Sequence, residues 1–410
     1  MAVSMLTYAY TGRDGAGKVV KGQLDAPSEG AAAARLRTMG VAPITVAESR
    51  EGTGLQREIR IPGITRGVSL KDLAVMSRQM ATMTTAGLAL LRSLAILSEQ
   101  TENKELARIL RVIKSDVESG TALSDALEKH AVVFPPIMVN LVRAGETGGF
   151  LEDSLNSVAQ NFEAEVKLRD TIKSALAYPV IVLAMAVLAV IGMLIFIVPV
   201  FEDMFKGLGG ELPVPTRMLV VLSTAMTWLG PVLLVAGVAF ACWWARNKNT
   251  LRVRQVVDPL KLKLPVFGPL LAKLAVARFS RNFSTMIGAG VPILQSLAIV
   301  GETSGNWVVE SALRKVQESV RQGNSIAGPL AQEPIFPAMV TQMIAVGEDA
   351  GALEQMLRKV ADFYDQEVQA TTEQLTAMIE PLMIAVIGAV IGGMIVALYL
   401  PMFSIFEYVR

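Results

Sequence analysis

The sequence contains little of the chemistry that most enzymes need. Among 410 residues there is one cysteine, Cys242, and one histidine, His130, and they lie in different regions. A single cysteine allows no intrachain disulfide. The scarcity also excludes Cys–His nucleophile pairs, helices with two histidine ligands and His-rich zinc sites. The net charge of +1 gives no electrostatic case for nucleic-acid binding. We therefore expect no catalytic residue, cofactor, metal or nucleic-acid partner.

Charge is missing altogether from three long runs. Residues 174–201, 218–245 and 381–406 contain no Asp, Glu, Lys or Arg. A helix that spans a bilayer needs about 20 apolar residues, so each run is predicted to cross the membrane once. The spans contain no Asp, Glu, Lys, Arg or His, and their one thiol is that of Cys242, whereas pumps and ion-coupled transporters usually place charges there. The N-terminus has no apolar core of a signal peptide, so no cleavable signal is expected.

A long segment of the chain occurs twice. The segment at 82–97, TMTTAGLALLRSLAIL, aligns without a gap with TMIGAGVPILQSLAIV at 285–300, and nine of the sixteen positions are identical. Further along, AGETGGFLE at 144–152 matches VGEDAGALE at 346–354. Two proline positions also recur, because Pro179 and Pro199 match Pro381 and Pro401. A repeat of about 130 residues indicates two copies of one structural unit.

The first copy has the pattern of a bundle of about six helices. Ser69 is a predicted N-cap, with Asp72 placed to complete a capping box. Further helices are expected at 90–100, 104–119, 123–129, 136–144 and from 151 onward, broken by Gly120, Phe134-Pro135 and residues 145–149. The stripe of Leu73, Met76, Met80 and Met83 is interpreted as core packing and not as a binding groove.

The N-terminal 50 residues have a different pattern, of strands around one helix. Two strands flank the turn RDGAGK, a helix at 29–39 follows the predicted N-cap Ser28, and a third strand follows Gly40. Gly12, Gly17 and Lys18 have the spacing of a phosphate-binding loop. That loop requires Ser or Thr next and then a helix. Val19 and a strand follow instead, so a glycine-rich hairpin turn is predicted.

Basic residues beside the spans predict the topology. Lys167, Arg169 and Lys173 precede the first span, and Arg246, Lys248, Arg252 and Arg254 follow the second. Positive flanks lie in the cytoplasm, so the second span returns the chain and the two repeats are parallel. The predicted order is a small module at 1–50, a linker at 51–68, bundle one at 69–173, spans at 174–201 and 218–245 around a periplasmic loop at 202–217, a cytoplasmic linker at 246–271, bundle two at 272–375, a span at 376–406 and a periplasmic tail at 407–410.

The doubled acidic turns are the most distinctive polar feature. The acids either cap helix ends and face solvent, or they form a surface for a cytoplasmic partner or a cation. The candidate partner-binding residues are Gly145, Glu146, Gly149, Leu151, Glu152, Gly347, Glu348, Gly351, Leu353 and Glu354. Gly87 and Gly290 are matched helix ends that anchor the two repeats. Gly388, Gly392 and Gly393 form a small-residue face for span packing, against another span of the chain, a second copy or a substrate helix.

These paired motifs carry a family resemblance. The chain resembles the inner-membrane platform proteins of type IV pilus and type II secretion machines. The resemblance covers nearly the whole chain. It rests on VSLKDLAVMSRQMATMTTAGLALLRSL and RFSRNFSTMIGAGVPILQSL, the two acidic turns, and the span entries at Tyr178-Pro179 and Glu380-Pro381. It implies a mainly α polytopic membrane protein with two cytoplasmic six-helix bundles, three spans and no enzymatic activity.

The resemblance also implies partners. Such platforms work with a hexameric assembly ATPase, with pilin or pseudopilin transmembrane helices, with other inner-membrane components, with membrane lipid, and with further copies of themselves as dimers or higher oligomers. Two alternatives remain. A transporter or channel subunit would need polar span linings, which are missing here. An archaeal-type filament scaffold would have more than three spans.

Overall fold

The computed structural model divides into two compact units, Met1–Gly67 and Val68–Arg410. It describes residues 6–13, 19–26, 29–38, 40, 42–48, 67–207, 212–248, 250–265 and 267–408. The expected N-cap Ser28, most of the linker at 51–68 and the predicted turn with Gly17 and Lys18 lie outside these ranges.

The N-terminal unit is a three-stranded antiparallel sheet with one helix. The strands β1 (Leu6–Arg13), β2 (Val19–Ala26) and β3 (Ala42–Glu48) are arranged in the order β2-β1-β3. The antiparallel register pairs Arg13 with Val19, so residues 13 and 19 close a hairpin. Helix α1 (Glu29–Thr38) buries Ala32 and Leu36. This agrees with the strand–strand–helix–strand order predicted from the sequence.

The first repeat contains six helices, as the sequence predicted. They are α2 (Leu70–Thr85), α3 (Leu90–Gln100), α4 (Lys104–Glu118), α5 (Leu123–Glu128), α6 (Pro136–Gly148) and α7 (Leu151–Gly192). The capping box at Ser69 and Asp72 is confirmed, because each side chain accepts a hydrogen bond from the other residue's backbone N–H. Met76 and Met80 are buried in the core and Met83 packs against it, which confirms the packing interpretation of this stripe.

The second repeat follows the first, helix for helix. Its helices are α11 (Gly268–Gly288), α12 (Ile293–Thr303), α13 (Trp307–Arg321), α14 (Ala327–Leu330), α15 (Ala338–Asp349) and α16 (Leu353–Tyr408). Gly87 and Gly290 have φ of 78° and 71°, a left-handed conformation that glycine adopts without a steric penalty. They end equivalent helices. Phe134 and Phe336 are buried at equivalent places in one continuous apolar core shared by both repeats.

One expected helix end is wrong. The sequence pattern placed breaks at residues 145–149, but α6 continues through Gly148, and α15 likewise continues through Asp349. Glycine inside a helix costs about 1 kcal/mol, which tertiary packing easily outweighs. A Cβ at Gly145 would lie 2.9 Å from the Leu151 Cα, and a Cβ at Gly347 would lie 2.9 Å from the Leu353 Cα. These glycines therefore allow close helix packing and do not end the helix.

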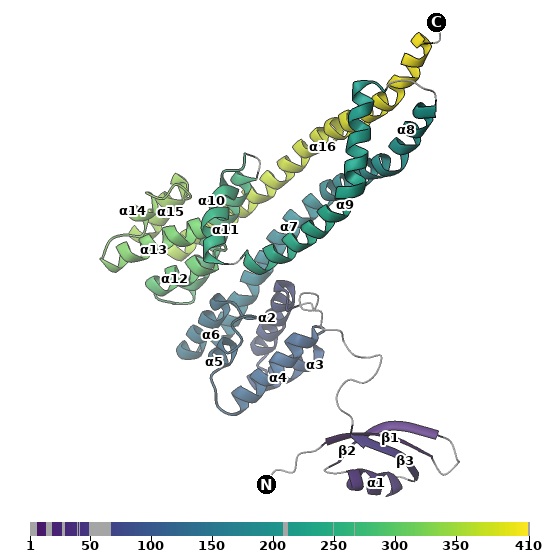
Figure 1. Cartoon of the computed structure of the whole chain (residues 1–410). Helices are drawn as coiled ribbons and strands as arrows, with labels where there is room; N and C mark the ends of the chain where they lie inside the picture. Colours follow the sequence, from purple (N-terminus) through teal and green to yellow (C-terminus); the bar gives the residue numbers. More distant parts are fainter. Residues whose placement is uncertain are drawn as a thin grey trace. The chain divides into compact units, whose positions relative to one another are not determined.

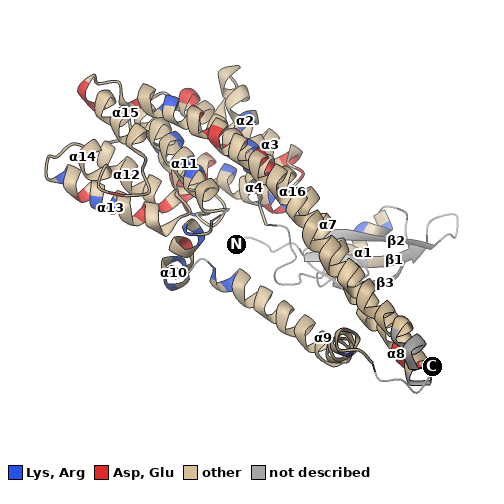
Figure 2. Ribbon diagram, turned by 90° about the horizontal axis from the view of Figure 1, so that it is seen from above, with Lys and Arg blue, Asp and Glu red and all other residues tan. Residues whose placement is uncertain are grey.

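In the part of the chain that the structure describes, three helices are long and apolar enough to cross a membrane. They occupy Leu151–Phe205, Val214–Asn247 and Leu353–Phe403. The first comprises α7, a π-helical turn η1 (Met193–Ile197) and α8 (Val198–Gly207), and the second is α9 (Val214–Asn247). In Figure 2 the distal parts of α7, α9 and α16 are almost entirely free of charge, whereas acids and bases gather on the bundles. Each repeat therefore runs without a break from its bundle into a span (Figure 1).

Candidate functional site

The two acidic turns hold a neighbouring helix in place. The Glu146 carboxylate accepts hydrogen bonds from the backbone N–H groups of Leu123 and Ser124, at 2.5 and 2.9 Å. The Glu348 carboxylate accepts from Ile326 and Ala327, at 2.6 and 2.9 Å. The first N–H groups of a helix have no partner within that helix. Each glutamate therefore caps the helix directly before its own, α5 or α14, and this contact is the same in both repeats.

The other residues of these turns divide into buried and exposed sets. Gly149 and Gly351 adopt left-handed φ of 76° and 66° between the two helices. Leu353 is buried, and Leu151 packs partly against the core. Glu152 is exposed, whereas Glu354 is half-buried and pairs with Arg358 at 2.5 Å. A partner could thus reach Glu152 more readily than Glu146 or Glu348, whose oxygens are already engaged with the backbone.

An ion pair is also duplicated, but its two copies differ. Arg78 binds both oxygens of Glu163, at 2.7 and 2.6 Å, and its hydrogen bonds lower the pKa of that carboxyl. The equivalent pair, Arg281 and Asp365, is more enclosed. Burial, with a smaller contribution from the nearby acids Asp362 and Glu165, raises the pKa of Asp365 despite its arginine partner. Its Oδ1 is also buried without a hydrogen-bond partner among the described residues. The surroundings of Glu163 therefore favour its ionised form, whereas the burial of Asp365 disfavours the ionised form of that acid.

Polar contacts and a small apolar cluster join the two bundles. Arg278 on α11 contacts both carboxylate oxygens of Glu165 on α7, at 3.0 and 2.6 Å, and both side chains are largely buried. Asn161 donates to Asn282 at 2.9 Å. Near the membrane end, α7, α11 and α16 share a small apolar cluster made by Leu168, Leu270, Val368 and Leu375. The bundles are therefore joined where their long helices lead into the spans.

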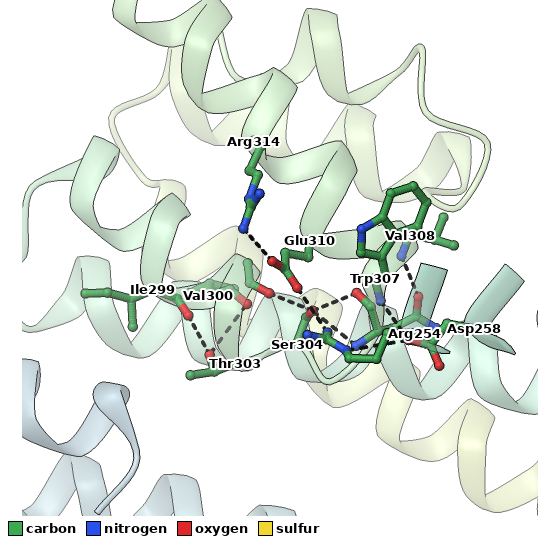
Figure 3. A network of polar contacts seen from close by, with 12 residues as sticks. Arg254, Asp258, Ile299, Val300, Thr303, Ser304, Trp307, Val308, Glu310 and Arg314 are labelled. Atoms are coloured by element: carbon green, nitrogen blue, oxygen red, sulfur yellow. Dashed lines mark hydrogen bonds and ion pairs between the residues drawn. The ribbon is translucent and has the colours of Figure 1, made fainter. Parts of the chain in front are cut away.

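Helix α10 (Leu251–Leu262) connects the second span to the second bundle. Asp258 accepts from the Trp307 backbone N–H at 3.0 Å, at the start of α13, and also pairs with Lys261. Arg254 lies 3.0 Å from Glu310, which binds Arg314 through its other oxygen (Figure 3). Asp258 and Glu310 are buried, so this polar network holds α10 firmly to the bundle. The sequence analysis did not find it, although the lone acid in a basic segment was a possible signal.

Two hydroxyls of the second span bind carbonyls that prolines leave free in the other two spans. The Ser223 hydroxyl donates to the Leu194 carbonyl, and the Thr216 hydroxyl donates to the Ala397 carbonyl, both at 2.5 Å. In the π-helical turn, the Val198 backbone N–H donates to the Met193 carbonyl. In the same register, the backbone N–H of the next residue would donate to the Leu194 carbonyl. That residue is Pro199, which has no N–H. Pro401 likewise has no N–H to donate to the Ala397 carbonyl, four residues earlier. Both hydroxyls are buried, seven residues apart on α9.

The small-residue face of the third span is open in this chain. A Cβ added at Gly388, Gly392 or Gly393 would meet no described atom within 4 Å. The three spans do meet elsewhere, in a cluster that contains Leu194, Val198, Met394 and Leu398 with Leu219 and Val220 packed against it. These glycines therefore do not pack against another described span of the same chain, and the expected span packing stays a prediction about another molecule.

The comparisons with known proteins agree with the duplication. The family described as "Type II secretion system (T2SS), protein F" matches residues 76–199 and again 279–401, and the N-terminal domain of protein F matches residues 1–47. The type IV pilus assembly protein PilC of Thermus thermophilus is 46% identical over 405 residues, which cover 98% of each chain. That of Myxococcus xanthus is 43% identical, covering 97% of this chain and 94% of its own.

A secretion protein is also similar over the whole length. The type II secretion system protein F of Xanthomonas campestris is 31% identical over 405 residues, covering 98% of this chain and 99% of its own. The names of these relatives describe assembly and secretion-system components and no catalytic activity. The chain is therefore a multi-pass membrane protein of the type II secretion system protein F family, to which these type IV pilus assembly proteins also belong.

Proposed function

We propose that the chain is a non-enzymatic platform in the inner membrane of a filament-assembly machine. It couples a cytoplasmic hexameric ATPase to the extraction of pilin or pseudopilin subunits from the membrane. The observation that carries this proposal is the continuity of α7 and α16 from bundle to span. Because each long helix belongs to both a bundle and the membrane, a force applied to the bundles is transmitted to the spans.

The spans supply a surface suited to a hydrophobic subunit. Extracting an apolar helix from lipid exposes surface at about 25 cal/mol per Å². The outer faces of α9 and α16 are apolar, with Leu234 and Ile384 each 68% exposed. The open face at Gly388, Gly392 and Gly393 suits close packing of another helix, either a pilin helix or a second copy. A platform of this kind lowers the cost of extraction, and the ATPase provides the energy.

The proposed topology places both bundles in the cytoplasm and the C-terminus in the periplasm. The basic flanks before the first span and after the second support this orientation. In it the acidic turns face the ATPase side. We propose the exposed Glu152, and not the engaged Glu146 and Glu348, as the part of these turns that a partner contacts.

The identities favour a pilus machine over a secretion machine. Four relatives named as type IV pilus assembly proteins are 35–46% identical to the chain, whereas three named type II secretion system protein F are 30–31% identical. We therefore propose type IV pilus assembly as the more specific role.

Affinity purification of the tagged chain from cross-linked native membranes tests the proposal. The expected partners are a hexameric assembly ATPase, pilin-like subunits and further copies of the chain, identified by mass spectrometry. Recovery of major pilins would indicate a pilus machine, and recovery of pseudopilins a secretion machine. The proposal fails if neither ATPase nor pilin-like subunit is recovered while known membrane complexes survive. It also fails if the purified chain hydrolyses ATP unaided.

A further inference from the structure

Helix α10 buries charged side chains and exposes large apolar ones. Its charged residues Arg254 and Asp258 point into the second bundle, where Asp258 is only 5% exposed. Val256 lies two residues after Arg254, and Leu260 lies two residues after Asp258. Two residues correspond to about 200° of rotation in a helix of 3.6 residues per turn, so the two apolar side chains lie on the opposite face from the two charged ones. They are 69% and 62% exposed. A surface helix of a globular protein normally buries its apolar stripe and exposes its polar one.

The exposed apolar row continues beyond the helix end and is flanked by positive charge. Leu264 and Phe267 are also exposed. Residues 246–267 contain six Lys or Arg and a single acid, Asp258, which is buried and paired. The exposed basic side chains near the apolar row include Arg252 and Lys263. An apolar face with basic edges is the pattern of helices that lie in the surface of an anionic membrane.

The position of α10 directly after a span places it close to the membrane. Span α9 ends at Asn247, and α10 begins at Leu251, only a few residues later. Trp243 and Trp244 lie near the end of the span, where aromatic residues mark the membrane–water interface. Because the linker is this short, α10 starts within reach of the lipid headgroups. The bilayer is therefore the nearest apolar medium for Val256 and Leu260.

We propose that α10 is a membrane-surface helix. Val256 and Leu260 insert among the acyl chains next to the headgroups, and Arg252 and Lys263 bind anionic lipid phosphates. The polar network of Arg254, Asp258 and Glu310 on the opposite face fastens the helix to the second bundle (Figure 3). The membrane thereby orients this bundle through a second attachment, in addition to α16. This proposal does not depend on the assembly function.

A fluorescent label at Leu260 tests the insertion. In a Cys242→Ala background, Leu260→Cys is labelled with an environment-sensitive dye, and the full chain is reconstituted into vesicles of phosphatidylethanolamine and phosphatidylglycerol. The matched control is Val346→Cys, an exposed valine on α15 of the same repeat. We expect the label at 260 to emit at shorter wavelength. We also expect lipids with a nitroxide on the acyl chain to quench it and aqueous iodide not to quench it. The label at 346 should show the reverse.

Two outcomes would overturn the insertion. One is that iodide quenches the label at 260 as strongly as the label at 346, which would leave the helix in water. The other is that protection from iodide disappears when the protein is diluted into excess lipid. That result would make a second copy the occupant of this face.

The role of charge has its own test. Replacing phosphatidylglycerol by phosphatidylcholine should reduce quenching of the 260 label by the lipid nitroxide. The double variant Arg252→Gln/Lys263→Gln should reduce it to the same level in the anionic vesicles. The control Lys359→Gln removes an exposed base of the same repeat, on α16, and should change nothing. If the double variant retains full quenching in anionic vesicles, the binding of lipid phosphate by these two residues is wrong.

Discussion

At the residue scale, the acids of the two repeated turns have different structural roles although the turns have similar sequences. Glu146 and Glu348 each accept two backbone hydrogen bonds from a neighbouring helix. Glu152, the second residue of α7, is exposed. The sequence presents all of these as parts of one doubled motif. The hydrogen bonds in the fold distinguish Glu146 and Glu348, which are structural, from Glu152, which is available to another protein.

Replacing Glu146 by alanine should destabilise the first bundle. The variant leaves the N–H groups of Leu123 and Ser124 without their acceptor, and loss of a helix cap costs about 0.5–2 kcal/mol. Thermal unfolding of the full chain in detergent should show a lower midpoint for Glu146→Ala. The matched control Glu152→Ala, in the same turn, should unfold like the wild type. Equal midpoints for the two variants would contradict the capping role.

The Arg78–Glu163 pair predicts a pH dependence. Hydrogen bonds from Arg78 hold the pKa of Glu163 below its ordinary value of 4.5. A lowered carboxyl pKa stabilises the folded chain above the ordinary value, and this contribution is lost as the pH falls through the folded-state pKa. The wild type should therefore unfold at a higher temperature than Glu163→Gln at neutral pH. The difference should shrink as the pH falls below about 4.5.

The control for this prediction is Glu152→Gln, whose exposed side chain forms no ion pair with another described residue. It should match the wild type throughout the titration. A difference between wild type and Glu163→Gln that stays constant down to acid pH would show that the pair stabilises by packing and not by charge.

At the element scale, α9 is the helix that joins the two repeats inside the membrane. It has no counterpart in the duplication, yet its Thr216 and Ser223 each serve a carbonyl of a different repeat. Pro199 and Pro401 each leave one carbonyl of their own span without a backbone donor, and a free carbonyl inside lipid is costly. The second span therefore does more than return the chain to the side of the first bundle, because it also binds a carbonyl that a proline leaves free in each of the other two spans.

Removing the Ser223 hydroxyl should weaken the packing of the spans. Hydrogen bonds between helices in membranes are worth about 0.6 kcal/mol on average and up to about 1.7. Ser223→Ala should therefore lower the thermal midpoint of the chain in lipid nanodiscs. Thr224→Val is the matched control, since Thr224 is exposed and its hydroxyl bonds only a carbonyl of its own helix.

A double-mutant cycle makes this prediction specific. Pro199→Ala restores an N–H that can serve the Leu194 carbonyl. Ser223→Ala should then cost less in the Pro199→Ala background than in the wild type. Additive losses would mean that the serine acts through packing and not through the carbonyl that the proline leaves free.

At the scale of the whole molecule, the two repeats are joined to each other and to the membrane by continuous helices. The bundles share one apolar core and are bridged by Arg278 and Glu165. Helix α16 extends over 56 residues without a break. Such an arrangement transmits displacement only as long as the helix between bundle and span is stiff.

Interrupting that stiffness should abolish assembly without preventing membrane insertion. An insertion of about seven glycine-rich residues after Thr376, roughly two helical turns, should make the connection flexible. An alanine-rich insertion of the same length keeps the helix continuous and is the matched control. We expect filament assembly to be lost with glycine and largely retained with alanine, at equal levels of the chain in membranes. Equal activity of the two would contradict force transmission through α16.

The sequence by itself determined the local elements and their order. Apolar run length fixed the three spans, and the internal duplication fixed two bundles with the same succession of helices, because periodicity and turn residues act over a few neighbouring positions. Only the tertiary structure decided that Gly145 lies within a helix, that Glu146 caps a helix 22 residues earlier, and that Ser223 serves a carbonyl 29 residues away. It also decided that α10 turns Arg254 and Asp258 toward the second bundle. These features depend on which surfaces meet across the fold, and such contacts leave no periodic signal in the chain.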